Sequence, residues 1–126
     1  MQSNHGNIFN FEELIVWQKE VLFAENVIRT LDDIETQRKH YRLIEQLEAA
    51  STSVAMNIAE GKGRHTTKEF IQFLYIARGS LFETITLLII LNLLDWLPEK
   101  NLTELSSLAE EITKMLNSLM ESLVAR

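Results

Sequence analysis

The 126 residues are enough for one domain, and 46% hydrophobic and 24% charged residues are ordinary values for a soluble globular protein. The absence of cysteine excludes disulfides and thiolate metal sites, and one proline with four glycines argues against a turn-rich all-β fold. A net charge of −6 and a pI of about 5.0 exclude attraction of nucleic acid to the whole surface, so such binding would need a local basic patch.

The N-terminal segment, residues 1–10, is polar and is expected to be a flexible tail without a secretory signal. The first helix is expected at about 11–31, where Asn10 and Glu13 have the spacing of a capping box. Apolar residues then recur every three or four positions, which predicts one buried helix face. The residues of this face are Leu14, Trp17, Val21, Ala24, Ile28 and Leu31.

The second helix is expected at about 38–60. Small side chains are frequent between Ala49 and Ala55, and they let a neighbouring helix come close. Gly61 stands where a left-handed glycine would end the helix.

The third helix is expected at about 66–94, and Thr66 with Glu69 predicts its capping box. Its second half is apolar on every side except at Asn92, which is more apolar surface than one bundle buries. The strongly apolar stretch Ile85–Leu94 is too short to span a bilayer, which needs about 20 residues, so no membrane association is expected.

The fourth helix is expected at about 102–124, with Asn101 and Glu104 as its capping box. Short links between four helices force neighbours to run antiparallel, so residues 11–126 are predicted to form an all-α, up-down-up-down four-helix bundle. The surplus apolar surface predicts a homo-oligomer, because monomers avoid large exposed apolar patches. A monomer with a wide core and a few exposed leucines is the alternative.

No group of residues has the pattern of a known catalytic or metal site. No glutamate is followed three residues later by a histidine, as di-iron bundles require, and there is no phosphate-binding loop or nucleophile elbow. We therefore expect a protein that is not an enzyme and that binds no cofactor and no metal.

Two sets of residues are candidates for contact with a ligand or partner. The first set is locally basic, and it could bind phosphate or simply be solvated charge. It comprises Arg38, Lys39, Arg42, Lys62, Arg64 and Lys68. The second set is polar and follows the hairpin of the second and third helices, where it could fix the register or form a partner site. It comprises Asn57, Glu60, Gly61, Arg78, Gly79, Ser80 and Glu83, with Gln46 expected near Ser80.

Three segments resemble the bacterial four helix bundle protein family, whose members are also called 23S rRNA-intervening-sequence proteins. They are FEELIVWQKEVLF (Phe11–Phe23), SVAMNIAEGKGR (Ser53–Arg64) and EFIQFLYIARGSLFE (Glu69–Glu83). The resemblance implies an up-down-up-down bundle that assembles as a homopentamer around a central channel. It also implies kinship with the accessory variability determinant of diversity-generating retroelements, which binds a reverse transcriptase and its template RNA.

The residues and the resemblance together predict a cytoplasmic, non-catalytic, pentameric scaffold associated with RNA or a nucleoprotein complex. Its partners would be copies of itself and RNA or a reverse transcriptase. The alternative is a protein-interaction module without direct contact to nucleic acid, which the acidic composition favours.

Overall fold

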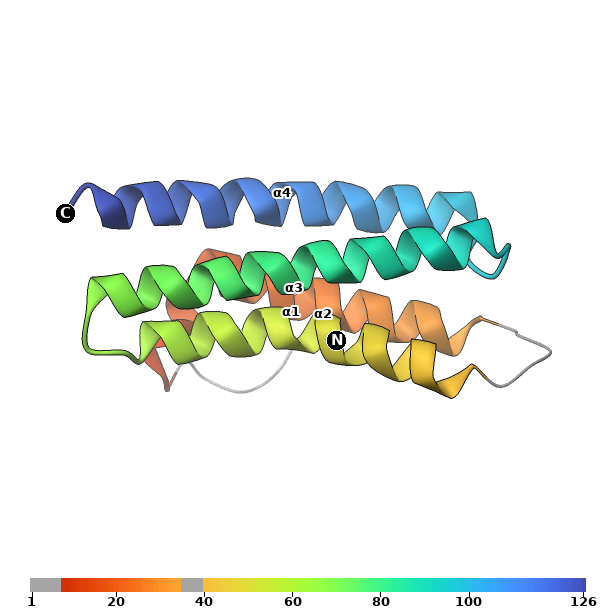
Figure 1. Cartoon of the computed structure of the whole chain (residues 1–126), viewed down its shortest axis with the longest axis horizontal. Helices are drawn as coiled ribbons and strands as arrows, with labels where there is room; N and C mark the ends of the chain where they lie inside the picture. Colours follow the sequence, from red (N-terminus) through yellow and green to blue (C-terminus); the bar gives the residue numbers. More distant parts are fainter. Residues whose placement is uncertain (1–7, 35–39) are drawn as a thin grey trace.

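The computed structural model describes residues 8–34 and 40–126, which form one short 3-10 helix and four α-helices (Figure 1). The elements are η1 (Asn10–Glu13), α1 (Ile15–Asp32), α2 (Tyr41–Lys62), α3 (Thr67–Leu93) and α4 (Glu99–Val124). Successive helices run in opposite directions, and α4 returns beside α1, so α1 and α3 lie diagonally across the bundle. The predicted all-α, antiparallel four-helix bundle is confirmed. Most of the expected tail lies outside the described residues, and Asn10 already belongs to η1.

Helix α1 begins later than residue 11, because Leu14 has an extended backbone (φ −71°, ψ 121°) that separates η1 from α1. The expected capping box of Asn10 and Glu13 is wrong. Instead, the carboxylate of Glu12 accepts hydrogen bonds from the backbone N–H of Ile8 at 2.7 Å and of Phe9 at 3.1 Å. The charged side chain therefore caps the short 3-10 turn before the main helix starts.

The core face of α1 is rotated from the predicted one, although Ala24 and Leu31 are buried as predicted. Val21 is 37% exposed, whereas Val16, Phe23 and Val27 are almost completely buried. Both series of residues recur every three or four positions, and Phe23 is the largest apolar side chain that α1 places in the core. Periodicity could not choose between two apolar faces on one helix, and in the structure Phe23 fills the core while the larger Trp17 of the predicted face is only partly buried.

Helices α2 and α3 come close together at Gly61, which is buried in the last turn of α2. A Cβ atom at Gly61 would lie 2.7 Å from the Cβ of Phe73 and 3.0 Å from a ring carbon of Phe70. The glycine therefore serves close helix contact, and the expected left-handed helix end is wrong, since α2 continues to Lys62 with no positive φ at any described glycine.

The turn between α2 and α3 lies at residues 63–66, later than expected, and this changes the register of the hairpin. Ser80 Oγ lies 3.1 Å from Ser53 Oγ, two helical turns along α2 from the expected neighbour Gln46. Thr66 caps α3 as predicted, since its hydroxyl oxygen accepts from the Glu69 N–H at 3.1 Å.

Helix α4 begins at Glu99 after Pro98, so Asn101 lies inside its first turn and is not the N-cap that the spacing indicated. Proline there fixes φ near −60° and has no N–H that the first turn would leave without a partner. The helix start therefore follows the proline, three residues before the expected position.

One acidic side chain lies inside the core. Glu20 on α1 is fully buried, and neither of its carboxyl oxygens has a hydrogen-bond partner among the described residues. Loss of solvation disfavours the charged form, so burial raises the pKa of Glu20 from 4.5 to about 9. The Glu20 carboxyl is therefore protonated at neutral pH.

Replacement of Glu20 with glutamine should remove a pH dependence of stability. Between pH 4.5 and about 9 the folded chain keeps a proton that the unfolded chain releases, so the free energy of unfolding falls as pH rises. The slope approaches about 1.4 kcal/mol per pH unit. Urea unfolding of the wild type and Glu20→Gln at several pH values in this window measures it. Equal slopes in the two proteins would contradict a buried, proton-binding Glu20.

Replacement of Gly61 with alanine should lower the free energy of unfolding by about 1–3 kcal/mol, because the added methyl overlaps Phe73. Gly63→Ala is the matched control. A Cβ at Gly63 would lie at an ordinary 3.6 Å from the Glu60 carbonyl oxygen, and its φ of −82° suits alanine, so stability should change by less than about 0.5 kcal/mol. Urea unfolding compares the two variants, and equal effects would count against close contact at Gly61.

Candidate functional site

The predicted basic residues that the structure describes fall at opposite ends of the bundle. Arg38 and Lys39 lie outside the described residues, and Arg42 is exposed in the first turn of α2. Lys62, Arg64 and Lys68 surround the turn between α2 and α3 at the other end. Only the cluster at the α2–α3 turn is therefore placed by the structure next to further polar side chains.

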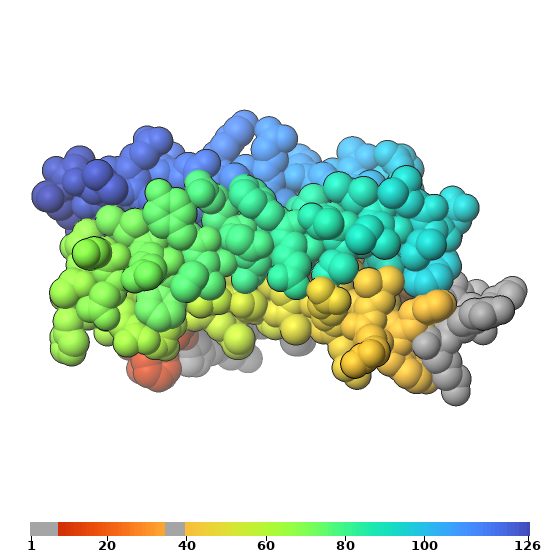
Figure 2. All heavy atoms as spheres, viewed as in Figure 1, coloured from red at the N-terminus to blue at the C-terminus, as the bar shows by residue number. Residues whose placement is uncertain are grey.

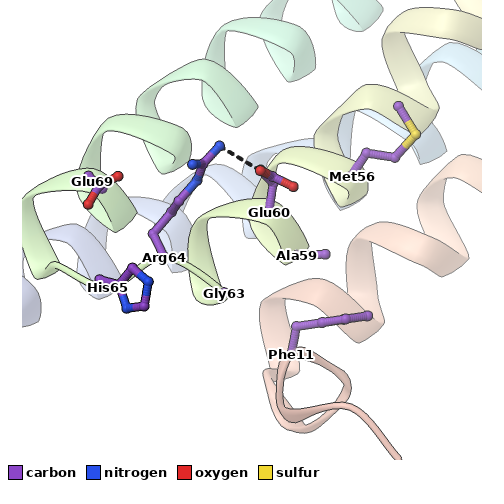
Figure 3. A pocket seen from close by; sticks show the side chains of 8 residues that line it. All are labelled: Phe11, Met56, Ala59, Glu60, Gly63, Arg64, His65 and Glu69. Atoms are coloured by element: carbon purple, nitrogen blue, oxygen red, sulfur yellow. Dashed lines mark hydrogen bonds and ion pairs between the residues drawn. The ribbon is translucent and has the colours of Figure 1, made fainter.

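A hollow of about 470 Å³ lies beside this turn, between α2, α3 and η1 (Figure 3). It is lined by Phe11, Met56, Ala59, Glu60, Gly63, Arg64, His65 and Glu69. Arg64 pairs with Glu60 at 2.6 Å, and its guanidinium lies 4.7 Å from the centre of the Phe73 ring. We call this space the mixed hollow, because it presents two carboxylates beside one arginine.

A second hollow of about 260 Å³ lies at the end of the bundle and shares Arg64 and His65 with the mixed hollow. Its floor is apolar and comprises Leu14, Phe70, Leu119 and Leu123. Its polar lining comprises Lys62, Arg64, His65, Thr66, Thr67 and Arg126. No carboxylate side chain is among these lining residues, and we call this space the basic cup.

Arg126 and His65 are members of the basic cup that the basic clusters in the sequence did not include. Arg126 is 62 positions from Arg64 and reaches it because α4 runs back to the end where α2 meets α3. The predicted antiparallel topology already placed these two ends together, so topology was the signal that could have found Arg126.

The polar residues of the α2–α3 hairpin mainly hold helices together. Asn57 Nδ2 donates to the backbone oxygen of Ser53 at 2.8 Å and to its hydroxyl at 2.9 Å, and that hydroxyl contacts Ser80. Arg78 Nη1 donates to Asn117 Oδ1 at 2.8 Å, which ties α3 to α4. Gly79 and Glu83 are exposed. Of these contacts, only the one between Ser53 and Ser80 crosses from α2 to α3 and matches the expected role in fixing the register.

The outward side of α3 carries a second series of residues with heptad spacing, and α3 runs the length of the face that Figure 2 shows. Phe82 is 50% exposed, Ile89 43% and Leu93 75%. We define the outer stripe as Tyr75, Gly79, Phe82, Thr86, Ile89 and Leu93. The inward side of the same helix is buried at Leu74, Leu81 and Leu88, so α3 has an apolar series on both sides.

By length and composition, α3 as a whole could cross a membrane, which the shorter stretch Ile85–Leu94 did not indicate. In the bundle, 39% of the most apolar 18-residue segment of α3 is buried. The core helix of a soluble protein can have the same length and composition. Helix propensity and hydropathy alone therefore do not assign α3 to a membrane. In the two described segments, no group of three or more His, Asp or Glu residues could hold a metal ion.

Comparison with known proteins identifies the fold and the family. A crystal structure of a protein of unknown function from the S23 ribosomal protein family of Bacteroides thetaiotaomicron superposes with a TM-score of 0.78 at 23% identity. The alignment covers 85% of this chain and 96% of that one, and at this identity it shows the fold alone. No curated protein matches the chain. Residues 12–118 match the 23S rRNA-intervening sequence protein family, to which the chain therefore belongs, as the three segments indicated.

Proposed function

We propose that this protein is a cytoplasmic, non-catalytic homo-oligomer, a pentamer, that serves as a scaffold for RNA or a nucleoprotein complex. The observation that carries the proposal is the outer stripe of α3, which leaves Phe82, Ile89 and Leu93 in water. Burial of apolar surface stabilises by about 25 cal/mol per Å², so covering this stripe is favourable. A second copy of the chain supplies an apolar surface of the same kind.

A protein surface fits the outer stripe better than lipid does. Arg78 and Glu83 lie in the middle of α3, beside the stripe, and charged groups at that depth in a bilayer are costly. Arg78 also stacks on Tyr75 at 4.9 Å, and arginine with aromatic residues is typical of the energetic centre of protein interfaces. Ile15 and Leu22 on α1 offer further exposed apolar surface for contact between copies.

The association with RNA is supported by the end of the bundle that holds the basic cup and the exposed Lys68. Phosphate contacts by lysine and arginine dominate affinity for nucleic acid. An oligomer repeats this end once per copy, and linked sites raise overall affinity without new contacts. The family description refers to an intervening sequence of 23S rRNA, and this description makes RNA the first partner to test.

A protein-interaction module without direct RNA contact is the second candidate. The outer stripe and the net charge of −6 favour it, since most of the surface repels phosphate. A reverse transcriptase bound to RNA could be the partner under both candidates, through its RNA under the first and through its protein surface under the second. Capture of a partner that survives nuclease treatment would favour the second candidate.

Charge placed in the outer stripe should dissociate the oligomer. The variant with Phe82→Glu and Ile89→Glu is expected to have a mass near 14.6 kDa by light scattering after size exclusion, and the wild type a multiple of it. A mass five times larger would support the pentamer. Thr103→Glu, an exposed change on α4, is the control and should leave the oligomer intact. A wild type that stays monomeric at high concentration would contradict the proposal.

Reversal of charge at the basic end should weaken RNA binding. In the variant with Arg64→Glu and Lys68→Glu, affinity for a short RNA should fall, and the slope against salt should drop by about one for each lost phosphate contact. Fluorescence anisotropy over a salt series measures both. Lys114→Glu is the matched control, since Lys114 is exposed and paired with Glu110 on α4. Absence of binding at low salt would reject direct RNA contact and leave the second candidate.

A further inference from the structure

The basic cup concentrates positive charge in a chain that is acidic as a whole. Three of the twelve lysine and arginine residues line it, together with His65, and no carboxylate side chain does. The mixed hollow next to it contains both Glu60 and Glu69. The two spaces share Arg64, and the charged side chains that line the basic cup itself are cationic, while the carboxylates of Glu60 and Glu69 stand just outside it, on Arg64 and Thr66.

Several donors of the basic cup are free to bind a ligand. Arg64 pairs with Glu60, but Lys62 and Arg126 make no ion pair within residues 8–34 and 40–126. The Thr66 hydroxyl is already used, because it accepts from the Glu69 N–H at 3.1 Å and donates to the Glu69 carboxylate at 2.9 Å. The amides of Thr67 and Lys68 open α3, where N–H groups lack partners inside the helix and the helix dipole is positive. The donors and the cations therefore act on the same small space.

The remaining lining of the basic cup is apolar. Phe70 and Leu123 are buried beneath it, with Leu14 and Leu119 beside them. Its residues come from the segment before α1 and from α2, α3 and α4, so it is walled by all four parts of the bundle end. A space enclosed in this way fits the end of an RNA strand better than the interior of the strand, which would need an open groove to continue on both sides. Cations above an apolar floor match a phosphate that is attached to a ribose and base.

We propose that the basic cup binds the phosphate at the end of an RNA strand, with the terminal nucleoside against the apolar floor. This inference rests on the proposed RNA association and names the group that the scaffold holds. A terminal phosphate monoester carries between one and two negative charges near neutral pH, whereas an internal phosphodiester carries one. Lys62, Arg64 and Arg126 therefore favour the terminal group.

The test compares one RNA sequence prepared with a 5′-phosphate, with a 3′-phosphate, or with hydroxyls at both ends. At physiological salt, one of the phosphorylated forms should bind about tenfold more tightly than the hydroxyl form, as expected for charge-assisted hydrogen bonds. Lys62→Gln and Arg126→Gln should each reduce this preference. Lys114→Gln removes the same charge about 18 Å along α4 from Arg126 and should retain it.

A second measurement locates the phosphate. Adenosine monophosphate should compete with the preferred RNA and should shift the amide signals of Thr67 and Lys68 in a nitrogen–proton NMR spectrum. Equal affinity for all three RNAs would overturn the inference while RNA association stands. Binding of adenosine monophosphate without a preference among the RNAs would assign the cup to a free nucleotide and overturn the RNA end as its ligand. Failure of every RNA to bind would overturn the RNA association as well.

Discussion

Helix α3 has apolar side chains on two sides, and one four-helix bundle covers only one of them. Leu74, Leu81 and Leu88 fill the core at intervals of seven, and Tyr75, Phe82 and Ile89 repeat the same interval on the outside. Helix α1 also leaves Ile15 and Leu22 exposed, but no other described helix has an outer apolar series as long as that of α3. The bundle is therefore complete as a fold while α3 still has an uncovered apolar surface, and the proposed assembly follows from that difference.

The geometry of the bundle end depends on the contact at Gly61. Because no side chain separates α2 from Phe70 and Phe73, the two helices meet closely just before the turn. Thr66 then starts α3 at once, and the short connection holds Lys62 and Arg64 at the rim of one space. The antiparallel return of α4 adds Arg126 from the far end of the sequence. A contact made for packing thus determines where the charges gather.

Sequence periodicity predicted the bundle because each helix has at least one regular apolar face, and on α3 that face runs from Phe70 to Leu91 with only Thr84 as a polar member. It failed on α1, where two faces fit the same spacing and the one with Phe23 is buried. The burial of Glu20 could not be predicted either, since an acidic residue is normally expected at the surface. Among the candidate contacts, Lys62 and Arg64 were visible as local charge, whereas Arg126 needed three-dimensional topology.

Electrostatics links the outer stripe to the basic cup. At physiological salt, charges act over about 8 Å, so the carboxylates elsewhere on a chain of net charge −6 are largely screened from the cup. An RNA strand is therefore repelled weakly by the surface as a whole and attracted only where Lys62, Arg64 and Arg126 stand together. One such site gives modest affinity, because three surface cations release few counterions. Assembly through α3 changes this, since several cups held at fixed distances bind one RNA or complex with a high effective concentration. A single bundle thus binds RNA weakly at a selective site, and joining several copies raises the overall affinity while each site keeps its selectivity.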